Sequence, residues 1–307
     1  MRKAFFSIAL GALILAITPT HAILFDEEDI QQQMVEIEQA KGRFLIINGD
    51  DFGMSHSTNI GMIECFEKGI VTSATIMMPC PAIQEAIDYK RREPRADVGL
   101  HLTLTNEWKS HHWGTVAPKE LVPSLYKTGT DQMWPEVRPV YQHAKLPEAR
   151  REILAQLDLA RELGLDFNHL DCHMGWYHFS PHLYRVVQHI AEKERLPIRV
   201  SLPPRIWSLR SEGLWVTDRL DYTLNGHKKE QLKDDLIQWI RGLEEGITEL
   251  VWHPAFCNEE LRSITGTAEA RDMQRALLVD PDVKDVVIEE RIILIGYEPL
   301  RRLSARP

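Results

Sequence analysis

Four short apolar segments of this chain carry or precede side chains that can bind a metal ion or move a proton: Asp50 with Asp51, His101, His173 and His253. The carboxyl ends of parallel strands meet at one rim of an α/β fold, so we expect these side chains to converge. Neighbouring carboxylates repel each other unless a cation or a shared proton relieves them. One carboxylate and two imidazoles around a divalent metal form a common hydrolytic centre, which would leave the other aspartate free as a base.

Each of these positions also has an ordinary structural explanation. The acidic pair at 50–51 could form a turn and a helix cap, and His101 could be a hydrogen-bonded core histidine. A third group, His169, Asp171 and His173, is harder to explain in this way. Alternate residues of an extended strand share one face, so these three side chains would lie together.

Apolar runs alternate with amphipathic segments from residue 43 onwards. Repeated βα units indicate a parallel sheet covered by helices, and repeated short buried strands favour a barrel over an open sheet. We therefore expect one α/β domain, a (β/α) TIM-like barrel over 43–307, with one long loop at about 106–146. The expected strands are 44–47, 72–78, 97–105, 166–173, 198–201, 248–252 and 292–295, and the expected helices are 59–68, 82–91, 147–164, 181–195, 230–243, 269–278 and 282–290.

The chain begins with a pattern typical of secretion. Two basic residues precede the apolar run 4–18, and small residues follow it, which predicts a signal peptide over 1–22. An uncleaved membrane anchor is the alternative. Residues 23–42 are expected to form a polar leader on the surface. The mature protein is then periplasmic or secreted, and the lack of a second long apolar run predicts no membrane association after the signal is removed.

Composition narrows the classes of partner. The chain has 307 residues, 44% hydrophobic and 26% charged, with a net charge of −9 and no long basic cluster, which argues against nucleic-acid binding. The four cysteines, Cys65, Cys80, Cys172 and Cys257, have no zinc-knuckle spacing. An oxidising compartment permits a disulfide, but buried free thiols are the default expectation.

Six sequence blocks, taken together, resemble the YdjC-like carbohydrate deacetylases, a family that includes the chitooligosaccharide deacetylases. The blocks follow the family's order from about residue 43 to 303, and the combination is specific where no single block would be. They are LIINGDDFG at 45–53, GIVTSAT at 69–75, VGLHLTL at 98–104, NHLDCH at 168–173, WHPAF at 252–256 and IGYEPL at 295–300.

The resemblance implies a distorted (β/α) barrel that binds one divalent cation, Mg²⁺ by family likeness or Zn²⁺ by the imidazole ligands. By motif position, the metal ligands are Asp51, His101 and His173. Asp50 is then the base that activates water, and His253 the acid that protonates the leaving amine. The implied reaction is hydrolysis of an N-acetylated carbohydrate to acetate and a free amine.

Other residues are expected around this centre. Asp171 is predicted to orient a ring nitrogen of a ligand from behind, with His169 nearby. Aromatic faces suit sugar rings, so the candidate substrate-binding side chains are Trp108, Trp113, Trp134 and Trp176. The aromatic loop could equally pack its own rings over the barrel.

Two features depart from the family pattern. The run HMGWYH at 173–178 lacks the extra histidines common after this position, and the secretory segment differs from the family's typical intracellular enzymes. A different barrel metallohydrolase is an alternative, although the few carboxylates at the rim argue against a two-metal site. A secreted glycan-binding protein on an inactive scaffold is a second alternative, disfavoured by the intact Asp and His set. A homodimer is compatible with the sequence.

Overall fold

The computed structural model describes residues 24–226 and 231–306. The expected signal peptide at 1–22 lies outside these residues, so the signal and the export that it implies stay predictions. Among the described residues, no helix has the length and the continuous apolar character that crossing a bilayer requires. All four cysteines carry free thiols; Cys65, Cys80 and Cys172 are buried as expected, whereas Cys257 is partly exposed.

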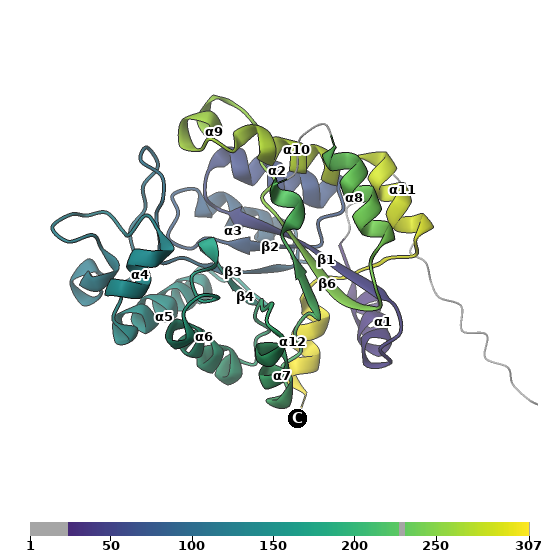
Figure 1. Cartoon of the computed structure of the whole chain (residues 1–307), viewed down its shortest axis with the longest axis horizontal. Coiled ribbons are helices and arrows are strands. Elements are labelled where there is room, and N and C mark those ends of the chain that lie inside the picture. The colour runs from purple at the N-terminus through teal and green to yellow at the C-terminus, as the bar shows by residue number, and fades with distance from the viewer. Residues whose placement is uncertain (1–23, 227–230, 307) are drawn as a thin grey trace, which may run out of the picture.

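A parallel sheet forms the centre of the molecule (Figure 1). Its strands within the described residues run in the order β4-β3-β2-β1-β6-β5, and β7 pairs with β1 as well. The strands are β1 (Arg43–Phe52), β2 (Ser73–Ile76), β3 (Val98–Leu102), β4 (Leu170–Cys172), β5 (Arg219–Asp221), β6 (Gly246–Trp252) and β7 (Ile293–Leu294).

Helices cover the sheet on two sides, with α2, α8, α10 and α11 on one side and α5, α6, α7 and α12 on the other (Figure 1). Strands covered on both faces need near-continuous apolar sequence, which explains the run Phe44-Leu-Ile-Ile47 in β1. The helices are α1 (Glu27–Glu38), α2 (His56–Lys68), α3 (Ile83–Arg92), α4 (Val137–His143), α5 (Leu146–Glu162), α6 (Pro181–Glu194), α7 (Pro203–Ser211), α8 (Leu232–Arg241), α9 (Glu259–Ile264), α10 (Ala268–Leu278), α11 (Pro281–Glu289) and α12 (Glu298–Ala305).

The α/β class and the parallel sheet are therefore confirmed, whereas closure of the strands into a barrel stays a prediction. The expected strand 198–201 makes one bridge, between Ile198 and Leu170 of β4, before Pro203 begins α7. The strand β5 was not expected, because the three residues Arg-Leu-Asp carry no apolar run.

The segment expected as a surface leader forms a helix, and one face of this helix packs on the apolar core. Asp26 caps α1 by accepting hydrogen bonds from the backbone amides of Glu28 and Asp29. The buried side chains Met34 and Ile37 of this helix join an apolar cluster with residues of β1, β6 and α12. The helix α1 thus closes the end of the sheet at which the strands begin.

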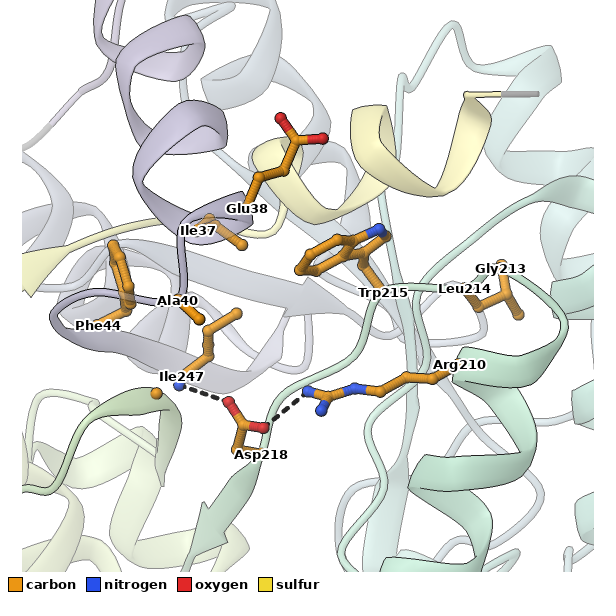
Figure 2. A pocket seen from close by; sticks show the side chains of 11 residues that line it. Ile37, Glu38, Ala40, Phe44, Arg210, Gly213, Leu214, Trp215, Asp218 and Ile247 are labelled. Carbon is orange, nitrogen blue, oxygen red and sulfur yellow. Dashed lines mark hydrogen bonds and ion pairs between the residues drawn. The ribbon is translucent and has the colours of Figure 1, made fainter.

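A groove of about 370 Å³ lies at this amino end (Figure 2). Phe44 and Ile247, near the starts of β1 and β6, line it together with Trp215. The ion pair between Arg210 and Asp218, 2.8 Å apart, forms its polar side. The groove is therefore at the opposite end of the strands from the aspartates and histidines that the sequence singled out.

One buried carboxylate helps to hold the long loop between β3 and α5. Glu152 of α5 is fully buried and accepts hydrogen bonds from the backbone amides of Val116 at 3.0 Å and Ala117 at 2.8 Å. Gln156 donates to the same carboxylate at 2.7 Å and also binds the backbone of Thr103, just beyond β3. The loop and the end of β3 are therefore held by the same helix.

Replacing Glu152 by alanine should destabilise the fold, because two buried amides lose their acceptor at about 1–3 kcal/mol each. Chemical denaturation of wild type and Glu152→Ala measures the loss. The control is Glu162→Ala, which removes an exposed glutamate at the end of the same helix. Equal midpoints for wild type and Glu152→Ala would show that the loop is held by other contacts.

Candidate active site

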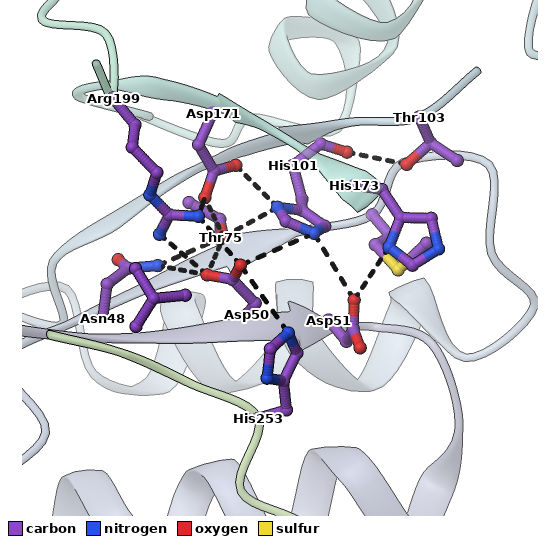
Figure 3. Close-up of polar contacts among 12 residues, drawn as sticks. Asn48, Asp50, Asp51, Thr75, His101, Thr103, Asp171, His173, Arg199 and His253 are labelled. Atoms are coloured by element: carbon purple, nitrogen blue, oxygen red, sulfur yellow. Dashed lines mark hydrogen bonds and ion pairs between the residues drawn. The ribbon is translucent and has the colours of Figure 1, made fainter. Parts of the chain in front are cut away.

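The two adjacent aspartates reach the same site because β1 is irregular where they stand. Neighbouring residues of a regular strand point to opposite faces. In β1 the pairing register with β2 shifts between Gly49 and Phe52, and Asp51 takes a positive φ of 70°. This bulge turns the Asp51 side chain toward the same region as Asp50 (Figure 3).

His101 lies in β3 directly opposite Asp171 of β4. Its Nδ1 atom is 2.7 Å from Asp171 Oδ1, and its Nε2 atom is 3.4 Å from Asp51 Oδ1. A carboxylate on Nδ1 fixes the proton there and leaves Nε2 free to bind a metal. The predicted orienting role of Asp171 therefore has the geometry that it needs.

His173 stands just beyond β4, at the start of a 3₁₀ turn, His173–Gly175. Met174 and Gly175 both have positive φ, 56° and 68°, so the chain turns sharply after the histidine. The Nδ1 atom of His173 is 3.1 Å from Asp51 Oδ1. Its other nitrogen, Nε2, faces the carboxylate of Glu107 at 2.9 Å.

Asp51, His101 and His173 are all buried, and one ligand atom from each lies within 4.8 Å of the others. Asp50, His101 and Asp171 meet the same distance condition. That second group fits a metal less well, because Asp171 occupies the Nδ1 side of His101 and an arginine engages both aspartates. The donor set of the first group, one oxygen and two nitrogens, suits a divalent cation with open positions.

Arg199 organises the carboxylates behind this group. It is 2% exposed, and its two terminal nitrogens each donate to one oxygen of Asp50 at 2.8 Å. Its Nη1 atom also lies 2.7 Å from Asp171 Oδ2, and its Nε atom donates to Glu249 of β6 at 2.8 Å. One guanidinium therefore pairs with three buried acids.

A second arginine binds Asp51, the carboxylate predicted to be a metal ligand. Arg271 of α10 places Nη2 2.8 Å from Asp51 Oδ2, while Asp51 Oδ1 faces the two histidines. Arg271 thus occupies Oδ2 of Asp51, and Oδ1 is left to bind a metal together with the two histidines.

Charges shift the pKa values of these groups strongly. The carboxylates of Asp171 and Asp50 raise the pKa of His101 to about 10, although burial of the ring lowers it. In the same way, Glu107 and Asp51 raise the pKa of His173 to about 9 against the effect of burial. Within the described residues, the carboxylates of this cluster outnumber its arginines, so protons on the histidines or a bound cation would offset the excess negative charge.

The acidic side chains stay ionised in spite of their burial. Arg199 and the neighbouring histidines, acting against burial, hold the pKa of Asp50 below its usual range. Arg271, His101 and His173 do the same for Asp51. Two ionised carboxylates side by side match the requirement of a metal ligand and a base.

His253 faces this pair from the end of β6. Its Nε2 atom is 3.9 Å from Asp50 Oδ2, and its side chain is 31% exposed. The backbone amide of His253 donates to Gln274 Oε1 at 2.8 Å, which fixes the chain at this turn. Burial lowers the pKa of the imidazole, so the ring is neutral at neutral pH.

His169 takes no part in the ligand group. Its Nδ1 atom binds Asn168 Oδ1 at 2.7 Å, its ring stacks on Tyr297 with centroids 3.7 Å apart, and its imidazole packs closely over Gly99. No contact described for its ring involves a predicted ligand. It follows that His169 supports the sheet beneath the site.

The four candidate tryptophans lie in different surroundings. The rings of Trp108 and Trp113 lie 5.9 and 6.0 Å from the ring of His173 and form one wall of the site. Trp134 stacks on His143, with centroids 4.6 Å apart, and donates to a backbone carbonyl of its own loop. Trp176 is fully buried and donates to the carbonyl of Leu102, so the expectation that it offers a face to substrate is wrong.

Three functional candidates were missed by sequence reasoning: Arg199, Arg271 and Glu107. Arg199 had a usable signal, because an arginine inside an expected buried strand requires acidic partners. Arg271 lies on an amphipathic helix and Glu107 in a loop. Nothing in the local sequence of either distinguishes it from a solvated charge.

Comparison with known proteins agrees with this geometry. Residues 44–289 match the family model described as YdjC-like protein. The carbohydrate deacetylase of Thermoanaerobacter pseudethanolicus is 32% identical over 268 residues, covering 84% of this chain and 100% of that protein. The chitooligosaccharide deacetylase of Proteus mirabilis is 30% identical over 259 residues, covering 83% of this chain and 98% of that protein.

A solved structure supports the fold as well. The crystal structure of an Enterococcus faecalis protein named for cellobiose-phosphate cleavage superposes with a TM-score of 0.75 and 27% identity. The match covers 85% of this chain and 99% of that one. The architecture described above is therefore shared over most of this chain and nearly the whole of that one.

Cation binding should release protons at pH 7. Without a cation both imidazoles are charged up to about pH 9, and a metal binds only the neutral ring. The apparent affinity should therefore rise with pH and level off once both rings are neutral. Calorimetric titration of Zn²⁺ in buffers of different ionisation enthalpy measures the release.

The control for this titration is His56→Ala, which removes an exposed histidine that pairs with Glu85 on the surface. This variant should release as many protons as wild type. Zinc uptake at pH 7 without proton release would contradict the assignment of His101 and His173 as ligands.

Proposed function

Because the chain belongs to the YdjC-like family, we propose that it is a metal-dependent carbohydrate N-deacetylase that converts an N-acetylated sugar to acetate and a free amine. The observation that carries the proposal is the meeting of Asp51, His101 and His173, with Asp50 and His253 beside them. A metal-dependent amide hydrolase needs this set: a cation site, a base and an acid.

The cation would be held by Asp51 Oδ1, His101 Nε2 and His173 Nδ1, the three atoms that face one another. A divalent ion bound there supplies a Lewis acid for the acetamide carbonyl and lowers the pKa of water. We propose Zn²⁺ or Mg²⁺, since the imidazoles suit the first and the carboxylate both.

Asp50 accepts the proton of the attacking water. Its Oδ2 atom lies 3.9 Å from His101 Nε2 and 3.9 Å from His253 Nε2, so a water bound to this oxygen would lie close to both rings. Arg199 donates hydrogen bonds to both oxygens of Asp50, and Asn48 donates to Oδ1 at 2.9 Å, so the orientation of the carboxylate is fixed. This fixed geometry compensates for the low basicity that Arg199 imposes on it.

His253 delivers a proton to the leaving amine, which is a poor leaving group when unprotonated. The neutral ring first has to acquire that proton, and Asp50, 3.9 Å away, holds the one removed from water. The water proton thus passes from Asp50 through His253 to nitrogen. The acid and the base act as one relay rather than as two independent groups.

The substrate sugar would lie against Trp108. This ring is half-buried beside His173, and it packs edge-on against Trp113 with centroids 5.4 Å apart. The Arg271 guanidinium lies 5.9 Å from the same ring and fixes it from the side of the metal ligand. An apolar sugar face on this wall brings its acetamide to the cation site.

Asp50→Asn should retain the metal and lose turnover by about 10²- to 10⁴-fold, the usual contribution of a general base. Asparagine keeps the shape and one oxygen for Arg199 but cannot take a proton. Acetate release from N-acetylated oligosaccharides and elemental analysis of the same sample measure both effects.

The matched control is Asp51→Asn, which should lose metal and activity together. If metal-replete Asp50→Asn releases acetate at a normal rate, Asp50 is not the base. If Asp50→Asn loses the metal while Asp51→Asn keeps it, the two aspartates have exchanged roles. Normal metal content without acetate release from any glycan by wild type would favour a binding protein instead.

His253→Ala should lower kcat by about 10²- to 10⁴-fold, with metal content unchanged, because the ring lies beside the base and not among the ligands. His178→Ala is the comparison, since His178 is the next histidine after the ligand turn and its pKa is lowered to about 4 by burial. Loss of kcat in His178→Ala, with normal kcat in His253→Ala, would move the acid to His178.

A further inference from the structure

Each histidine of the ligand group has a carboxylate on the nitrogen that faces away from Asp51. For His101 this partner is Asp171, 2.7 Å from Nδ1 and fully buried in β4. For His173 the partner is Glu107, whose two oxygens lie 3.1 and 2.9 Å from Nε2. The Glu107 side chain is 22% exposed and comes from the loop after β3.

The loop holds Glu107 in place through its neighbour. The backbone amide of Asn106 donates to the carbonyl of Trp134 at 3.0 Å, and the Asn106 side chain donates to the carbonyl of His111 at 3.1 Å. The His111 ring lies 2.8 Å from the carbonyl of Met54, just beyond β1. These bonds tie the turn that carries Glu107 to the end of β1.

We propose that Glu107 is a positioning residue that keeps the proton of His173 on Nε2 and so leaves Nδ1 as the metal-binding atom. A carboxylate that accepts from Nε2–H fixes both the tautomer and the ring orientation, and it raises the basicity of the ligand nitrogen. The inference rests on the proposed function, since it takes His173 as a ligand.

The alternative tautomer would damage the site in a specific way. With the proton on Nδ1, the nitrogen 3.1 Å from Asp51 Oδ1 would donate a hydrogen bond to the carboxylate and could not bind a cation. Nε2 would then be the free nitrogen, on the side of the ring away from His101 and Asp51. By keeping the proton on Nε2, Glu107 therefore excludes the tautomer in which Nδ1 of His173 is protonated and cannot bind the cation.

The position of Glu107 also links the metal centre to the substrate wall. Trp108 follows it directly in sequence and packs 5.9 Å from the same histidine ring. A substrate pressing on Trp108 thus acts on the segment that orients a ligand. In contrast, Asp171 lies in the sheet and is isolated from the substrate.

The test uses the full chain with three substitutions. Glu107→Ala should weaken Zn²⁺ binding by about 10- to 100-fold, the usual effect of removing such a partner. Glu107→Gln should weaken it less, because the amide oxygen still accepts from Nε2–H. Glu85→Gln is the control, since Glu85 contacts the exposed His56 at 3.0 Å in the same manner. Competition with a chromophoric chelator measures the affinities.

A second measurement identifies the ligand atom. In zinc-loaded wild type, ¹⁵N spectra of the labelled histidines should show His173 bound through Nδ1 and protonated on Nε2, and Glu107→Ala should lose that single pattern. Zinc bound through Nε2 of His173 in wild type would overturn the proposal. Unchanged zinc affinity in both Glu107 variants together with a raised KM would overturn it too, and would make Glu107 a substrate contact.

These outcomes separate the inference from the function. If the zinc affinities and spectra follow expectation but wild type releases no acetate, the positioning role stands and the deacetylase proposal falls. If wild type takes up no zinc or magnesium, the ligand assignment fails and the inference fails with it. Acetate release alone does not test the positioning role of Glu107.

Discussion

The whole site depends on the pairing of one buried guanidinium with three carboxylates. Arg199 contacts Asp50 of β1, Asp171 of β4 and Glu249 of β6, so it joins strands from both halves of the sheet. Tyr297 donates to the second oxygen of Glu249 at 2.6 Å and completes that acid's pairing. Breaking a buried pair of this kind costs about 3–5 kcal/mol, because a charge is left without a partner. Asp50, the proposed base, is therefore held by the same interaction that joins the strands.

Asp171 connects Arg199 to His101, one of the proposed metal ligands. One of its oxygens lies 2.7 Å from Arg199 and the other 2.7 Å from His101. The orientation of the His101 ring is thus set by a carboxylate that cannot rotate without losing the guanidinium. The proposed base Asp50 and the proposed ligand His101 are fixed by one network, and a variant of Arg199 would disturb both together. The effects of substitutions within this network on the free energy of unfolding are therefore not expected to be additive.

The sequence was sufficient to predict which residues at the ends of strands meet in the site. It was insufficient to predict which residues reach the site from other elements. Asp50, Asp51, His101 and His253 follow or occupy apolar runs, so the geometry of a parallel sheet predicts their convergence. Glu107 belongs to a loop whose path depends on tertiary contacts. Trp176 shows the opposite error, since it was predicted to bind substrate but lies in the core. It is close in sequence to His173, but the positive φ values of Met174 and Gly175 turn the chain so that the indole is buried.

The bulge at Asp51 explains why the acidic pair needs the rest of the network. A non-glycine residue at a φ of 70° costs of the order of 1–3 kcal/mol. Glycine would relieve that strain, but it would remove the oxygen that faces His101 and His173. Arg271 binds the other Asp51 oxygen at 2.8 Å and so stabilises the conformation that the backbone disfavours. The strain is tolerated because two neighbouring carboxylates can share one face of the sheet only where the strand departs from regular alternation.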